Sequence, residues 1–128
     1  MSEITMAFDF GTTKIGVAVG QKITGTATPV SIVPARDGIP DWDAMDRLME
    51  EWQPKEFVVG LPINMDGTES DMSLAAEKFS RRLHGRYNKP AHLMDERLST
   101  FEAKSYDDDP GQVDAIAAKL ILESWLAS

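Results

Sequence analysis

Two short apolar runs joined by the tripeptide Gly11-Thr12-Thr13 constrain what this chain can fold into. Residues 4–8 (ITMAF) and 15–19 (IGVAV) have the composition of buried β-strands, and so short a connection predicts a hairpin. Asp9 ends the first run. A carboxylate on a central strand, beside backbone that a ligand can approach closely, is typical of a site for a metal ion or a phosphate-bearing substrate. An ordinary turn-forming Asp is the alternative.

Three further segments have the pattern of strands. Residues 24–33 (TGTATPVSIV) form the third, and Pro29 predicts that this strand lies at an edge or is interrupted there. Residues 56–61 (EFVVGL) are a continuous apolar run, typical of a buried parallel strand. Residues 91–96 (AHLMDE) are the fifth strand. The segment 35–42 (ARDGIPDW) is predicted to be a loop.

Helical periodicity follows the third, fourth and fifth strands. The first helical stripe is Met45, Leu48, Met49 and Trp52, and the second is Met72, Ala75, Ala76, Phe79, Leu83 and Tyr87. Ser99 and Glu102 have the spacing of a capping box. Asp109-Pro110 opens a last amphipathic helix. This order of elements predicts a mixed sheet with helices on both faces, in which the fourth and fifth strands run parallel to the first.

Composition narrows the class of protein. A length of 128 residues, 42% of them hydrophobic, predicts one domain over residues 1–128. The absence of cysteine and the presence of only two histidines exclude disulfides and thiolate or His-rich metal sites, and His92 is expected to be a packed or partly exposed residue. No run approaches the roughly 18–20 apolar residues of a membrane span, so we expect a soluble, cytoplasmic protein. The net charge of −8 disfavours tight nonspecific binding of polyanions, although residues 78–89 are locally basic.

Acidic residues are expected to converge at one end of the sheet. Asp9 ends the first strand, Asp95 and Glu96 end the fifth, and Asp114 lies one turn into the last helix. Carboxylates that meet from these three places must share protons or bind cations, and oxygen ligands without His or Cys suit Mg²⁺ or Mn²⁺. Beside a phosphodiester, such an ion would activate water and stabilise the leaving oxygen. Each acid also has an ordinary structural explanation: Asp95 can pair with Arg97, Glu96 can lie at the exposed end of a strand, and Asp114 can be favoured by the helix dipole in the first turns of its helix.

Four stretches, in this order along the chain, resemble the YqgF (RuvX) family of RNase H-like proteins, which are known as Holliday-junction resolvases and as nucleases that mature pre-16S ribosomal RNA. They are residues 8–20 (FDFGTTKIGVAVG), 58–70 (VVGLPINMDGTES), 94–103 (MDERLSTFEA) and 113–126 (VDAIAAKLILESWL). The resemblance implies an α/β RNase H-like fold with a five-stranded mixed sheet of order 3-2-1-4-5. It also implies an endonuclease dependent on Mg²⁺ or Mn²⁺, and it carries the catalytic and metal-binding roles onto Asp9, Glu96 and Asp114.

Substrate contacts are also implied by the resemblance. These roles fall on Lys14, Arg97, Ser99, Thr100 and Asn64. The implied partners are structured RNA or branched DNA and ribosomal precursor particles, with the protein a monomer or a homodimer. Family members usually have Arg where this chain has Lys14, so bidentate recognition of phosphate is lost. They also have a longer basic loop where this chain has the short acidic segment 104–112 (KSYDDDPGQ).

Two other classes of protein stay open. Sugar kinases and actin-like ATPases have a similar phosphate-binding hairpin, but they clamp ATP between two domains, and 128 residues cannot supply both. A nucleic-acid-binding or ribosome-assembly protein with an RNase H-like fold and little nuclease activity is the second alternative. The acidic segment favours it, whereas the three acids argue against it. Binding of a divalent metal that is lost in Asp9→Asn would favour the enzyme.

Overall fold

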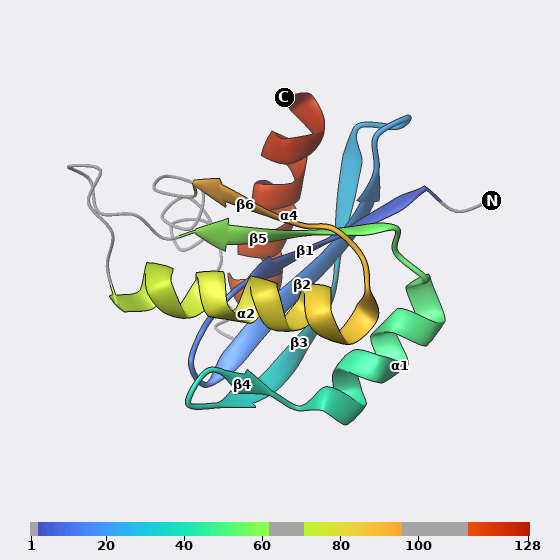
Figure 1. Cartoon of the computed structure of the whole chain (residues 1–128). Coiled ribbons are helices and arrows are strands. Elements are labelled where there is room, and N and C mark those ends of the chain that lie inside the picture. The colour runs from blue at the N-terminus through green and yellow to red at the C-terminus, as the bar shows by residue number, and fades with distance from the viewer. Residues whose placement is uncertain (1–2, 62–70, 96–112) are drawn as a thin grey trace.

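A single six-stranded sheet organises the computed structural model, which describes residues 3–61, 71–95 and 113–128, with side chains from residue 115 onward in the last range. The strand order is β4-β3-β2-β1-β5-β6 (Figure 1). The strands are β1 (Ile4–Asp9), β2 (Lys14–Gln21), β3 (Thr26–Arg36), β4 (Ile39–Pro40), β5 (Glu56–Leu61) and β6 (Ala91–Asp95). The first four pair antiparallel, and β5 and β6 run parallel to β1. The predicted α/β class and the order of the five longer strands are confirmed, but the count of five strands is wrong by one.

The additional strand, β4, lies in the segment 35–42, so the prediction of a loop there is wrong. Ala35 pairs with Pro40 and Arg36 with Ile39. The connecting residues Asp37 and Gly38 have φ values of 52° and 81°. Positive φ at both central residues is what a two-residue hairpin turn needs to match the twist of its strands, and Asp-Gly is a strong signal for it. The third strand accordingly extends to Arg36.

Pro29 interrupts the pairing of β3, as predicted. Ala18 of β2 is opposite Pro29, whereas Val17 is opposite Ser31, so Val30 is an additional residue in β3 at this point. On its other side, β3 pairs with β4 only at Ala35 and Arg36. Proline therefore lies in the part of β3 that has no second neighbour among the described strands, where its missing N–H is tolerated.

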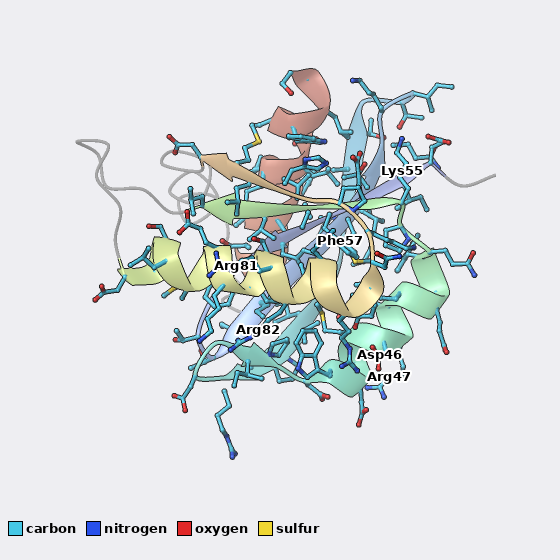
Figure 2. All side chains as sticks on the ribbon, in the orientation of Figure 1. Asp46, Arg47, Lys55, Phe57, Arg81 and Arg82 are labelled. Atoms are coloured by element: carbon cyan, nitrogen blue, oxygen red, sulfur yellow. The ribbon has the colours of Figure 1, made fainter. Side chains whose placement is uncertain are left out.

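Helices cover both faces of the sheet, and each face has its own core. The helices are α1 (Trp42–Trp52), α2 (Asp71–Tyr87) and α4 (Val113–Ala127). The larger core lies between the sheet and α1 and α2, and includes Phe8, Phe57 (Figure 2) and Phe79, which are completely buried. The smaller core lies beneath α4 and includes Ala7 and Val58. Among the described residues, no helix is long and apolar enough to span a membrane.

Small residues on β2 allow α4 to pack closely against the sheet. Ile15, Val17 and Val19 belong to the larger core, so the alternating positions Gly16, Ala18 and Gly20 face α4. A Cβ atom built on Gly20 would lie 2.4 Å from the carbonyl oxygen of Thr26 and 3.1 Å from Leu122 Cδ2. Only glycine therefore fits between β3 and α4 at this position.

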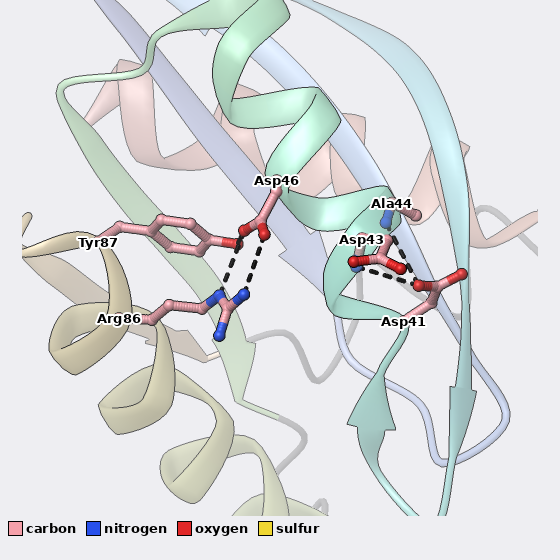
Figure 3. A network of polar contacts seen from close by, with 6 residues as sticks. All are labelled: Asp41, Asp43, Ala44, Asp46, Arg86 and Tyr87. Carbon is pink, nitrogen blue, oxygen red and sulfur yellow. Dashed lines mark hydrogen bonds and ion pairs between the residues drawn. The ribbon is translucent and has the colours of Figure 1, made fainter.

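A polar cluster joins α1 to α2 at the edge of the larger core (Figure 3). The Asp46 carboxylate on α1 accepts hydrogen bonds from Arg86 Nη2 at 2.9 Å and from the Tyr87 hydroxyl at 2.6 Å, both on α2. Arg86 also lies 4.7 Å above the centre of the Trp42 ring. The bonds from Arg86 and Tyr87 lower the pKa of Asp46, while burial and the bond to Asp46 raise the pKa of Tyr87. The cluster fixes how the two helices of this face meet.

Candidate active site

Asp9 is a buried carboxylate at the end of the central strand β1, with only 7% of its surface exposed. Phe8 belongs to the core beneath α1 and α2, and Ala7 belongs to the core beneath α4. Because side chains alternate along a strand, Asp9 faces the α4 side of the sheet. A carboxylate this buried requires compensation by hydrogen bonds or by positive charge.

The sheet register brings the first turn of α4 toward Asp9. Asp9 is opposite Gly16, and Gly16 is opposite Ile32, so the three residues form one row across β1, β2 and β3. Ile32 and Ala115 line the same cavity of about 280 Å³. Asp114 precedes Ala115 in this first turn, and its side chain is outside the described set. The first turn of α4 therefore lies on the face of the sheet that Asp9 occupies, and the convergence of Asp9 and Asp114 stays a prediction.

The turn between β1 and β2 is held beside Asp9 by hydrogen bonds to the β3–β4 hairpin. Thr13 O accepts from Ala35 N at 2.8 Å, and Thr12 O accepts from Gly38 N at 3.0 Å. A Cβ on Gly11 would lie 2.5 Å from the Lys14 carbonyl oxygen, so glycine is required there. Lys14 is exposed and alternates with Gly16, and it therefore lies on the same side of the sheet as Asp9. Of the predicted substrate-binding residues, Lys14 is the only one among the described residues, and its role in binding substrate stays a prediction.

The fifth predicted strand also ends at this end of the sheet. In β6, Asp95 pairs with Leu61 of β5. Because β5 and β6 run parallel to β1, their carboxyl ends lie at the same end of the sheet as Asp9 (Figure 1). Two strand spacings separate β6 from β1, which is about 10 Å. The remaining predicted site residues lie outside the described residues: Glu96, Arg97, Ser99, Thr100 and Asn64.

The chemistry available at this end of the sheet is that of hard oxygen ligands and a cation. Asp9 offers a carboxylate, Lys14 offers an ammonium group on the same face, and neither thiolate nor imidazole adjoins them in the sheet register. Oxygen donors of this kind fit Mg²⁺ or Mn²⁺. Within residues 3–61, 71–95 and 115–128, no three acidic or imidazole side chains are close enough to form a metal site by themselves.

A second polar group, which the sequence did not reveal, lies at the opposite end of the sheet. Glu56 accepts a hydrogen bond from the Thr5 hydroxyl at 2.8 Å and lies 3.1 Å from His92 Nε2. The His92 ring stacks on Trp125 of α4, with 4.7 Å between ring centres. The prediction that His92 is a packed or partly exposed residue is confirmed. No local signal indicated this group, because its four members come from four different elements.

The chain is similar in sequence to a family of nucleases over nearly its whole length. A family model described as "RuvX: Holliday junction resolvase" matches residues 3–128. Two relatives are named "Putative pre-16S rRNA nuclease". The one from Azotobacter vinelandii is 54% identical, over 97% of this chain and 93% of the relative. The one from Chromohalobacter salexigens is 57% identical, over 97% of this chain and 89% of the relative. A third relative of the same name, from Escherichia coli O1:K1 / APEC, is 52% identical over 98% of this chain and 96% of the relative.

Solved structures of resolvases share the fold. The fowlpox virus resolvase bound to Holliday junction DNA has a TM-score of 0.59, with 10% identity over 97% of each chain. T. thermophilus RuvC bound to a Holliday junction substrate has a TM-score of 0.52, with 12% identity over 93% of this chain and 91% of that chain. At these identities the likeness concerns the fold, and it confirms the predicted RNase H-like architecture.

Proposed function

Because this chain belongs to the RuvX family of Holliday junction resolvases, we propose that it is a nuclease that hydrolyses phosphodiester bonds. Pre-16S ribosomal RNA is the first candidate substrate, since the relatives at 52–57% identity carry the name of a nuclease for that RNA. A branched DNA junction is the second, because the description of the matching family names that substrate.

One observation carries the catalytic part of the proposal. Asp9 is a buried carboxylate at the end of the central strand, on the same face and at the same end of the sheet as the first turn of α4, which includes Asp114. Glu96 directly follows β6, which ends at that same side. We expect the three acids to form one site, Asp9 and Asp114 from facing layers and Glu96 from the neighbouring edge.

Asp9, Glu96 and Asp114 would hold Mg²⁺ or Mn²⁺ through carboxylate oxygens, the ligands that these ions prefer. When bound, such an ion lowers the pKa of a coordinated water and neutralises charge on the leaving oxygen. Asp9 contributes a fixed position, because a strand paired on both sides holds its last residue in place. The burial of Asp9 keeps competing water away from one side of the carboxylate.

The remaining site residues are proposed to position the substrate. Lys14, exposed on the Asp9 face, would contact a phosphate beside the scissile bond as a point charge. Arg97 would contribute a planar guanidinium that can bind a phosphate in bidentate fashion. Ser99, Thr100 and Asn64 would donate hydrogen bonds to the phosphate or sugar.

A cleavage assay with a matched pair of variants tests this function. The substrates are a labelled RNA with the unprocessed 5′ end of the small-subunit precursor and a four-way DNA junction, each with Mg²⁺ or Mn²⁺. We expect Asp9→Asn to reduce cleavage by more than about 100-fold, because even outer-shell partners of metal ligands contribute about 10- to 100-fold. Asp43→Asn removes an exposed carboxylate from α1, on the other face of the sheet, and should cleave like the unaltered chain.

Thermal unfolding gives a second measurement that does not depend on activity. A cation present at about 100 times its Kd stabilises the folded state by about 2.7 kcal/mol, which raises the Tm of a domain of this size by about 10 °C. We expect Mn²⁺ to raise the Tm of the unaltered chain and of Asp43→Asn, but not of Asp9→Asn. If neither substrate is cut and Mn²⁺ leaves the Tm unchanged, the nuclease proposal is wrong, and a binding protein without catalysis takes its place.

A further inference from the structure

The charge of this protein is strongly segregated along the chain. Residues 78–89 contain five of the 13 Lys and Arg residues and no Asp or Glu, so the rest of the chain has 21 acidic residues against eight basic ones. Most of the stretch belongs to α2 (Asp71–Tyr87). An acidic protein therefore presents one concentrated region of positive charge.

Part of this charge has a structural role. Arg86 pairs with Asp46, and the Lys89 ammonium donates to the Pro54 carbonyl oxygen. His84 bonds through Nδ1 to the Lys89 carbonyl oxygen at 2.9 Å. These residues are in or just beyond the last turn of α2, where positive charge also complements the helix dipole. The contacts of Arg86, Lys89 and His84 stabilise the fold, and this explains why these residues are present.

Lys78, Arg81 and Arg82 have no such explanation. They lie at i, i+3 and i+4 on α2: Arg81 is on the side opposite the buried residues Phe79 and Leu83, and Lys78 and Arg82 flank it. Lys78 and Arg81 are exposed and Arg82 is half-buried, and none of the three forms an ion pair with another side chain in the described part of the chain. Like charges at these spacings repel and weaken a helix. Glu77, four residues before Arg81, offsets part of this repulsion, but the three cations have no ion pair in the described part of the chain and are available to an anionic partner.

A groove adjoins this face on the side of Arg81. Arg81 and His84 line a groove of about 490 Å³ between α2 and the beginning of β6, together with Ser80, Pro90 and Ala91. From Ala91, β6 runs about 13 Å along the sheet edge to Asp95, at the end where the catalytic acids are expected. Figure 2 shows Arg81 and Arg82 on α2 below β5 and β6.

We infer that the face formed by Lys78, Arg81 and Arg82, with the adjoining groove, binds the sugar–phosphate backbone of a single-stranded segment of the substrate, away from the bond that is cut. This site rests on the proposed nuclease function, because it would hold the same nucleic acid. It lies on the α2 side of the sheet, whereas Asp9 faces α4, so the bound strand passes around the β6 edge. Phosphate contacts of this kind position a substrate without reading its sequence.

Salt-dependent binding in the Asp9→Asn background, where cleavage is not expected, tests this site. The probes are a fluorescein-labelled single-stranded RNA and a DNA strand of the same sequence, followed by fluorescence anisotropy. Each phosphate contact on a single strand contributes about −0.7 to the slope of log K against log salt. We expect Arg81→Gln/Arg82→Gln to reduce the magnitude of this slope by about 1.4, so the parent loses about sevenfold more affinity than the variant between about 50 and 200 mM salt.

Two control variants separate a binding face from a general change in charge. Arg47→Gln/Lys22→Gln removes two exposed cations from elsewhere on the protein and should keep the parental slope of log K against log salt. Arg81→Lys/Arg82→Lys keeps both positive charges and should have a slope close to the parental one. Arg47 is labelled on α1 in Figure 2. A loss with both probes supports recognition of phosphate alone, and a loss with RNA only supports an added contact to the ribose hydroxyl.

The site is refuted if Arg81→Gln/Arg82→Gln keeps the parental slope, or if Arg47→Gln/Lys22→Gln loses as much. Cleavage by the chain with Asp9 intact is measured separately, on the same RNA. Normal cleavage with an unchanged slope overturns this site and leaves the nuclease function standing. A changed slope without any cleavage overturns the nuclease function and leaves a nucleic-acid-binding face.

Discussion

The same substitution, glycine to alanine, should have opposite effects at two positions of this fold. Gly20 lies on β2 beneath α4, and Gly85 lies on the exposed side of α2. A Cβ on Gly20 meets backbone on one side and Leu122 on the other, whereas a Cβ on Gly85 meets nothing within 4 Å. Neither glycine has a positive φ, so the surroundings alone decide the sign of the effect.

The magnitude follows from the contact distances. At Gly20 the new Cβ would be 2.4 Å from the Thr26 carbonyl oxygen, well inside the roughly 3.3 Å of a close carbon–oxygen contact, and the oxygen belongs to backbone that is paired in the sheet. Overpacking costs about 1–3 kcal/mol, and the stiffer unfolded chain returns about 0.4–1 kcal/mol. We therefore expect Gly20→Ala to lower the free energy of unfolding by about 1–2 kcal/mol. Gly85→Ala should raise it by about 0.5–1 kcal/mol, because alanine is the better helix former.

Guanidinium denaturation of both variants measures these values, with an unchanged m-value as the sign that only stability differs. Near the midpoint of thermal unfolding, Gly20→Ala should lower the Tm by about 4–8 °C, and Gly85→Ala should raise it by about 2–4 °C. If Gly20→Ala is neutral or stabilising, then β2 does not lie as close to the Thr26 carbonyl group and to Leu122 of α4 as described.

Three further substitutions test the two faces of α2 and its junction with α1. Phe79→Ala should lower the free energy of unfolding by about 3–5 kcal/mol in denaturant titration, because this completely buried ring lies 5.4 Å from the Phe8 ring, and a smaller loss would contradict that packing. Hydrogen bonds from Arg86 and Tyr87 lower the pKa of Asp46 in the folded protein. The Asp46 carboxylate therefore stabilises the fold fully at pH values above its pKa in the unfolded chain, about 4, and this stabilisation decreases as the pH falls below that value. The difference in unfolding free energy between the unaltered chain and Asp46→Asn should therefore narrow below about pH 4, and a constant difference would refute this role. Lys78→Gln removes repulsion from Arg81 and Arg82, so it should raise the free energy of unfolding by about 0.2–0.5 kcal/mol, and a loss of stability by calorimetry would argue against that repulsion.

Local sequence patterns determined most of the elements. The apolar runs 4–8, 15–19 and 56–61 predicted β1, β2 and β5, and the helical stripes predicted α1 and α2, because these patterns are properties of neighbouring residues. The loop prediction over 35–42 failed although Asp37-Gly38 carries a hairpin signal, since a strand of two residues has too few positions to show alternation.

The sequence also determined which residue types are available for chemistry: carboxylates without cysteine, Asp9 at the end of an apolar run, and a motif order typical of one family. Only the tertiary structure decided which face of the sheet Asp9 occupies, because that depends on which helix covers each face: Phe8 lies in the core beneath α1 and α2, and Ala7 in the core beneath α4. The tertiary structure also distinguishes Lys78, Arg81 and Arg82 from the basic residues whose contacts stabilise the fold. Such sorting depends on contacts between residues far apart in the chain, and no local period encodes these.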